Sequence, residues 1–228
     1  MTAKLHLVED PLFAGFYPVK DAARLLDHPN NRKIRAWLAG WKNNDPIIDR
    51  DFGDTDTVSF LDLMELRFVD FFRSHGVSMQ TLRRASERLR QEWQTSHPFA
   101  LKNAEYLTDR RSVFAQVAKE NGDKVTYNAA TGQHEMWETL EGVISRGVVF
   151  DPKTALAEQW RPRADFEDVI IDPKVAFGKP VVMKTQVPTI ALYRLWRAER
   201  SFSAVADWFQ LEDQQVRSAV EFELALAA

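Results

Sequence analysis

Six basic side chains between residues 20 and 42 have the clearest potential to bind a ligand. They are Lys20, Arg24, Arg32, Lys33, Arg35 and Lys42. Lysine and arginine supply most of the protein contacts to nucleic-acid phosphates, and only two carboxylates, Asp21 and Asp27, oppose these cations within the stretch. The cluster therefore predicts a phosphate-binding surface. The alternative is an ordinary helical hairpin with a solvated basic face.

Two short amphipathic helices are expected to position these cations. Apolar residues recur at 19, 22, 23 and 26, and again at 34, 37, 38 and 41, which is the spacing of one helical face. The intervening HPNN sequence ends the first helix and offers Asn31 as a cap for the second. This pattern predicts a helix-turn-helix whose second helix could enter a DNA major groove, with Trp37 on its buried face.

The composition limits the class of protein. At 228 residues the chain exceeds the usual size of one domain, about 150 residues, and it has no cysteine, which excludes disulfides and thiol chemistry. It has no apolar run long enough for a membrane span, so we expect a cytoplasmic protein. The net charge is −3, and residues 201–228 carry one arginine against five carboxylates, so the two ends are expected to bind different partners.

The sequence gives little support for catalysis. The five histidines, at 6, 28, 75, 97 and 134, have no partner at metal-ligand spacing, and there is no phosphate-binding glycine loop. Gly53, Asp54 and Asp56 resemble only a fragment of a calcium loop. We therefore expect a protein that is not an enzyme, with no catalytic residue, metal or cofactor.

Two longer helices are expected next. Thr57 or Ser59 can cap a helix over residues 60–73 that is apolar over most of its circumference, with Asp62 and Glu65 among the polar residues confined to the rest. Ser78 can cap another helix, over residues 79–93. Arg83 and Arg84 point outward from it and could contact phosphate, although solvated helix charges are the commoner explanation.

The rest of the chain predicts a small α+β segment followed by a helical bundle. We expect a hairpin of strands 112–118 and 124–127 around Asn121-Gly122, a helix over 135–145, and a second hairpin of 148–150 with 155–160. Short strands at 169–171 and 181–182 then lead into helices 190–198, 204–209 and 213–226. The predicted fold is mainly helical α+β, with domains at residues 1–95, 96–163 and 164–228.

Three parts of the sequence resemble known families in the same order. FYPVKDAARLLDHPNNRKIRAWLAGW resembles the start of a MerR-type winged helix, and SFLDLMELRFVDFFRSHGVSMQTLRRASERLR resembles the helices after its wing. DFEDVIIDPKVAFGKPVVMKTQVPT, with the helices that follow, resembles an antitoxin-associated helix-turn-helix family. Its Asp-Pro and Gly-Lys-Pro elements are present, whereas Lys184 and Gln186 replace a glycine and an arginine, which weakens any phosphate-binding role of this turn. Together they resemble a VapB-type antitoxin of a type II toxin–antitoxin module.

The resemblance implies an antitoxin that neutralises a PIN-like ribonuclease toxin and represses its own operon as a homodimer on operator DNA. It makes Arg35 the best single candidate for a DNA contact. The expected DNA-binding residues are Lys20, Arg24, Asn31, Arg32, Lys33, Arg35, Lys42, Arg83 and Arg84. The expected toxin or dimer contacts are Gly178, Lys179, Pro180, Trp196, Trp208, Phe209 and Phe222. A stand-alone regulator that senses a ligand through its middle segment, and a protein–protein adaptor, remain alternatives.

Overall fold

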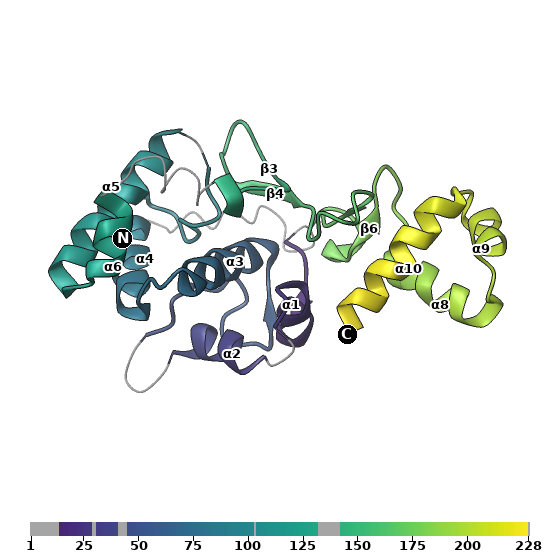
Figure 1. Ribbon diagram of the computed structural model, residues 1–228, viewed down its shortest axis with the longest axis horizontal. Coiled ribbons are helices and arrows are strands. Elements are labelled where there is room, and N and C mark those ends of the chain that lie inside the picture. The colour runs from purple at the N-terminus through teal and green to yellow at the C-terminus, as the bar shows by residue number, and fades with distance from the viewer. Residues whose placement is uncertain (1–13, 29–30, 41–44, 103, 132–141, 228) are drawn as a thin grey trace.

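The computed structural model describes residues 14–28, 31–40, 45–102, 104–131 and 142–227. Within these ranges the chain is mainly helical, with three antiparallel two-stranded sheets, and the predicted α+β class is confirmed (Figure 1). The elements are β1 (Tyr17–Pro18), α1 (Val19–Leu25), α2 (Arg32–Ala39), β2 (Thr57–Val58), α3 (Phe60–Ser74), α4 (Met79–Trp93), α5 (Ala104–Asn121), α6 (Lys124–Thr131), β3 (Val148–Phe150), β4 (Ala157–Trp160), β5 (Val169–Ile170), η2 (Ala176–Gly178), β6 (Val181–Val182), α8 (Thr189–Glu199), α9 (Phe202–Phe209) and α10 (Asp213–Ala227).

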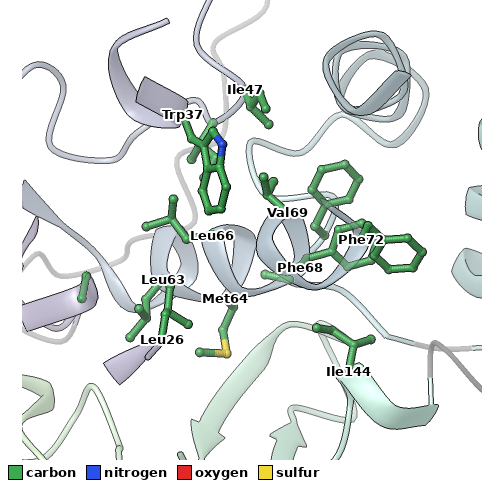
Figure 2. Close-up of a cluster of buried hydrophobic side chains, with 14 of the residues drawn as sticks. Leu26, Trp37, Ile47, Leu63, Met64, Leu66, Phe68, Val69, Phe72 and Ile144 are labelled. Atoms are coloured by element: carbon green, nitrogen blue, oxygen red, sulfur yellow. The ribbon is translucent and has the colours of Figure 1, made fainter. Parts of the chain in front are cut away.

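Helix α3 is the centre of the larger hydrophobic core. The predicted Ser59 cap is confirmed: its side chain accepts a hydrogen bond from the backbone of Asp62, whose carboxylate accepts one from the backbone of Ser59. Apolar side chains project from α3 on several sides, toward Trp37 and Ile47 in one direction and Ile144 in another (Figure 2). The prediction that Trp37 belongs to the core is thus confirmed.

The N-terminal pair of helices is closed by a small sheet. β1 and β2 are antiparallel, with Tyr17 opposite Val58. After α1, α2 and the segment that follows them, the chain therefore returns to pair with the strand that precedes α1. α1 and α2 pack against each other through buried apolar faces. This confirms the two predicted helices, whereas their assignment to a winged-helix family stays a prediction.

The hairpin predicted around Asn121-Gly122 is wrong. The structure has helices on both sides, α5 and α6, and α5 packs against α4 and α6. Val113, Phe114 and Val117 are buried at helical spacing, and Asp123 accepts hydrogen bonds from Thr126 at the start of α6. The Asn-Gly pair therefore ends one helix and precedes another. Most of the helix predicted for residues 135–145 lies outside the described residues.

The second predicted hairpin is confirmed as β3 and β4, which pair antiparallel with a register irregularity between Val149 and Phe150. β4 is also bonded to the residue that follows β5, because the backbones of Trp160 and Ile171 exchange two hydrogen bonds. β5 and β6 then pair antiparallel. Strand hydrogen bonds thus connect the middle of the chain to the loop that precedes α8.

The three predicted C-terminal helices are confirmed as α8, α9 and α10, with Ser201 as the cap of α9. They enclose a second, smaller core that includes Leu192, Val205 and Val216. The end of α10 returns toward α1 (Figure 1), where Arg24 Nε donates to the Leu226 carbonyl at 3.1 Å. The domain boundaries at residues 95 and 163 stay a prediction. In the described part of the chain, no helix has the length and apolar character needed to cross a membrane.

Candidate functional site

The exposed face of α2 carries the densest group of cations among the predicted DNA contacts. Arg32, Lys33 and Arg35 are exposed on this helix, while Ile34 and Trp37 on its other face are buried. Burial of the apolar face fixes which side of the helix meets solvent. The predicted exposure of these cations and the predicted burial of Trp37 are therefore correct. The binding of this surface to DNA stays a prediction.

Arg35 forms a two-pronged ion pair with Asp56, the residue before β2. Its Nη1 lies 2.7 Å from Asp56 Oδ1, and its Nη2 donates to Oδ2 at 3.0 Å. The backbone carbonyl of Asp56 also accepts a hydrogen bond from Val19, at the start of α1. The ion pair holds the Arg35 guanidinium in place, and a phosphate would have to compete with the Asp56 carboxylate for the N–H groups of Arg35.

The other predicted DNA contacts around α1 and α2 differ in availability. Lys20 is exposed, whereas the Arg24 guanidinium is engaged with the end of α10 and lies 4.0 Å from Asp21. Asn31 occupies the cap position of α2, but its side chain makes no capping hydrogen bond, so the predicted side-chain cap is wrong. Its contact with DNA stays a prediction. Lys42 lies outside the described residues.

Arg83 and Arg84 lie on α4, next to the segment that follows α2. Arg83 Nε donates to the Asp45 carbonyl at 2.9 Å, and Arg84 donates to the Asn121 side chain. Together with Arg90 they line an open groove of about 760 Å³ between α4 and residues 45–46. Tertiary folding thus places α4 cations beside the loop after α2, an adjacency that the sequence did not reveal.

Trp208 is the most prominent of the predicted toxin or dimer contacts. It is 75% exposed on α9, although large aromatic side chains are usually buried. Trp196 is half-buried and stacks on Phe202, with ring centroids 5.5 Å apart, and Phe209 is also half-buried. Lys179 is exposed. Trp208 is therefore the best placed of these aromatic residues to enter an interface.

Two of the predicted contact residues are interior. Phe222 is fully buried and meets Phe166 edge-on, with ring centroids 5.7 Å apart, so it offers no surface to a partner. Gly178 is also buried, and it packs against Tyr17 of the same chain. Both predictions failed for the same reason: an apolar residue in an amphipathic pattern and a glycine in a motif can each be required by packing within the chain.

A buried group of titratable side chains was missed. Asp62 and Glu65, which the sequence places on the polar part of α3, are both fully buried, and His97 is 5% exposed. His97 Nε2 lies 3.0 Å from Asp51 Oδ1, and its Nδ1 lies 3.8 Å from Asp62 Oδ1. A cap at Ser59 was among those predicted from the sequence, but the approach of His97 and Asp51 was not, because these residues are far apart along the chain.

Burial dominates the protonation of this group. It raises the pKa of Asp62 to about 6 and that of Glu65 to about 7. Burial acts to lower the pKa of His97, but the hydrogen bond and charge of Asp51 outweigh it and raise the pKa. Asp51 therefore favours the charged form of His97, whereas burial favours the protonated forms of Asp62 and Glu65.

The overall fold is one already seen in a solved structure. The crystal structure of Rv2018 from Mycobacterium tuberculosis matches with a TM-score of 0.66 at 24% sequence identity, over 93% of this chain and 98% of that chain. This likeness establishes the arrangement of the elements.

Two sequence comparisons add to the structural match. A Mycobacterium tuberculosis (strain ATCC 25618 / H37Rv) protein named "Putative antitoxin VapB45" is 24% identical over 226 residues, covering 90% of this chain and 92% of that protein. Residues 169–222 match a family described as "Protein of unknown function (DUF433)". The chain is thus a distant homologue, over nearly its full length, of a protein named as a VapB antitoxin.

Proposed function

We propose that this protein is an antitoxin that binds and neutralises a ribonuclease toxin and represses its own operon by binding DNA. The observation that carries the proposal is the similarity to the protein named VapB45, because it covers about nine-tenths of both chains. A match confined to residues 169–222 would have supported only a shared C-terminal module.

The α1–α2 unit is the proposed DNA-binding element. Arg32, Lys33 and Arg35 are exposed together at the start of α2, where their positive charge favours phosphate. A homodimer would present two copies of α2 to successive major grooves about 34 Å apart, and would therefore bind a palindromic operator. The segment between α2 and β2 is rich in aspartate, so we assign the phosphate contacts to the helix rather than to this segment.

The α8–α10 bundle is the proposed toxin-binding element. Trp208 supplies an exposed aromatic anchor, and Asp207, Glu212, Asp213 and Glu221 surround it in sequence with exposed carboxylates. A ribonuclease of the PIN-like type needs a basic surface to hold RNA. An acidic bundle with an aromatic anchor has the charge to cover such a surface.

A specific observation favours this function over a ligand-sensing regulator. In the ligand-sensing alternative, the aromatic residues between Phe99 and Trp160 would line a pocket, but the cavity beside Phe68, Phe99 and Phe150 holds only about 20 Å³. That space is enough for about one water molecule. This cavity is therefore too small for a ligand larger than water.

The proposal is tested by co-expressing the chain with the product of an adjacent nuclease-like gene. An antitoxin should restore growth to cells that express the toxin and should co-purify with it. A promoter fragment from the same operon should bind the purified chain more tightly than unrelated DNA of equal length. Failure to bind the neighbouring protein would overturn the antitoxin role, and failure to prefer the promoter would overturn the repressor role.

A further inference from the structure

The buried group around His97 joins three separate parts of the chain. Asp51 comes from the segment before β2, Asp62 and Glu65 come from the first turns of α3, and His97 comes from the turn that follows α4. One possible ligand atom from each of Asp51, Asp62 and His97 lies within 4.8 Å of the others. Glu65 follows Asp62 by three residues, so both are on the same side of α3.

We propose that this cluster is a binding site for a divalent transition-metal ion such as Zn²⁺, held by His97 Nδ1 and Asp62 and completed by water, with Asp51 orienting the imidazole. These residue types are the nitrogen and oxygen donors that zinc accepts when cysteine is absent. Nothing in the proposed antitoxin function requires such an ion. The inference is therefore independent of that function.

Three buried atoms of this group have no hydrogen-bond partner, and two of them, Asp62 Oδ1 and His97 Nδ1, lie beside the proposed ion position. Among the described residues, no donor or acceptor completes a hydrogen bond with Asp62 Oδ1, Glu65 Oε2 or His97 Nδ1. The other oxygen of each carboxylate is already fixed, because Asp62 Oδ2 accepts from Ser59 N at 2.9 Å and Glu65 Oε1 accepts from Phe99 N at 2.6 Å. Buried polar atoms are nearly always satisfied, so the pair Asp62 Oδ1 and His97 Nδ1 favours a ligand between them.

The spacing of these atoms is compatible with coordination. Two atoms that each lie about 2.1 Å from a zinc ion can be separated by up to about 4.2 Å. His97 Nδ1 and Asp62 Oδ1 are 3.8 Å apart, too far for a hydrogen bond and within the range of two ligands of one ion. A cation between them would satisfy both atoms at once.

The hydrogen bond from His97 to Asp51 favours metal binding through the other ring nitrogen. Nε2 lies 3.0 Å from Asp51 Oδ1, so a proton on Nε2 leaves the lone pair of Nδ1 directed at Asp62. Metal-binding histidines usually donate their second ring N–H to a carboxylate, which fixes the tautomer and makes the ligand more basic. Asp51 occupies that position here.

The charge balance also favours a cation. Asp51, Asp62 and Glu65 supply three carboxyl groups, while the positive groups that interact with them are the His97 imidazole and the Arg90 guanidinium. Arg90 is directed elsewhere, since it donates to the carbonyls of Ile47 and Ser96. Buried carboxylates that are not neutralised by a cation must retain protons, and a divalent ion would remove that need.

A metal ion here would hold the DNA-binding unit together. It would tie the segment before β2 to the start of α3 and to the turn at His97, and that segment also carries Asp56, the partner of Arg35. Removing the ion should therefore lower the stability of the whole chain and not just of one loop.

The test uses the untagged full-length chain after treatment with a chelator. Isothermal titration with Zn²⁺ should show one high-affinity equivalent, and one equivalent of Co²⁺ should give a visible absorption band typical of nitrogen and oxygen ligands. Adding Zn²⁺ should raise the melting temperature. Absence of a single high-affinity equivalent would overturn the proposal and would show that protons alone balance the cluster.

Two variants and one control locate the ion. Asp62→Asn preserves size and can still accept from Ser59, and His97→Gln removes the ring nitrogen; each should weaken Zn²⁺ binding at least 10-fold. His28→Gln removes the histidine of another half-buried pair, His28–Asp70, whose atoms are 2.7 Å apart, and should leave the affinity unchanged. Unchanged affinity in either cluster variant would overturn the site. If a variant is unfolded by circular dichroism, the wild-type Zn²⁺ stoichiometry and Co²⁺ spectrum decide.

Discussion

Gly178 lies so close to Tyr17 that the chain has no room for a side chain at position 178. A β-carbon there would fall 2.2 Å from the Tyr17 phenol oxygen and 2.8 Å from the adjacent ring carbon. The backbone of Gly178 also has φ +81°, a conformation that side chains disfavour. The loop before β6 and the first strand, β1, are thus in direct contact, which Phe16 N reinforces by donating to the Phe177 carbonyl at 3.0 Å.

This contact predicts that Gly178→Ala is strongly destabilising. The left-handed backbone and the clash with Tyr17 should together cost about 2–4 kcal/mol of unfolding free energy. Urea denaturation followed by circular dichroism measures the loss. Gly53→Ala is the matched control: Gly53 has φ +57° but nothing within 4 Å of an added β-carbon, so it should lose only about 1–2 kcal/mol. Equal losses at the two positions would contradict the packing contact.

Asp123 connects the starts of two helices, and its contribution to stability should depend on pH. Its Oδ2 accepts from Thr81 Oγ1 at 2.7 Å near the start of α4 and from Thr126 Oγ1 at 2.8 Å near the start of α6. Although burial acts to raise its pKa, these and further hydrogen bonds lower it from 3.8 to about 2. The lowered pKa means that the stabilisation is complete above about pH 4 and is lost as the pH falls toward 2.

The change that tests this contribution is Asp123→Ala. It should cost about 1 kcal/mol at pH 6, the usual effect of losing a helix cap. The difference in urea midpoint between wild type and variant should shrink steadily between pH 4 and pH 2. A difference that is absent at pH 6, or unchanged at pH 2, would show that the ionised carboxylate is not the stabilising form.

Trp208 and Phe222 should behave in opposite ways when they are replaced. Trp208→Asp removes an exposed ring and should abolish or greatly weaken toxin binding with little change in stability, since surface changes usually shift it by no more than about 0.5 kcal/mol. Phe222→Ala creates a cavity and should cost about 3–5 kcal/mol. Affinity measurements and urea melts separate the two effects. Val125→Ser, at an apolar position on α6 that is 60% exposed, is the control and should change neither.

Arg35→Ala should weaken binding to promoter DNA and make it less sensitive to salt. Loss of one phosphate contact should reduce the slope of log affinity against log salt concentration by about one. Fluorescence anisotropy at increasing KCl concentrations measures both quantities. Arg88→Ala is the control, because Arg88 lies on α4 and pairs with Glu92 at 3.0 Å and Glu120 at 3.8 Å, and is not a proposed contact. An Arg35 variant with unchanged affinity and slope would contradict the role assigned to α2.

Local signals predicted the helices best. Ser59 and Ser78 each occupy the cap position that was predicted or allowed for them, and the apolar spacing of α2 correctly placed Trp37 inside. These signals act within one or two helical turns, so a single sequence contains them. The same is true of the β3–β4 hairpin, whose strands are adjacent along the chain.

Long-range packing explains what the sequence did not predict. Val113 and Phe114 suit a strand equally well until α4 packs against them, and the Asn-Gly pair is found in turns of more than one kind. His97 lies 46 positions from Asp51, so no spacing rule could have associated them. Phe222 was assigned to a toxin or dimer contact because a helical pattern alone cannot distinguish the core of the chain from an interface.

The most direct test of the proposed function is inhibition of the neighbouring nuclease by this chain. The purified nuclease should cleave a fluorescent RNA substrate, and adding the antitoxin at a comparable molar concentration should stop cleavage. The Trp208→Asp variant should require a much higher concentration for the same effect. Cleavage that continues unchanged at a large excess of the folded wild-type chain would contradict the claim that this protein is an antitoxin.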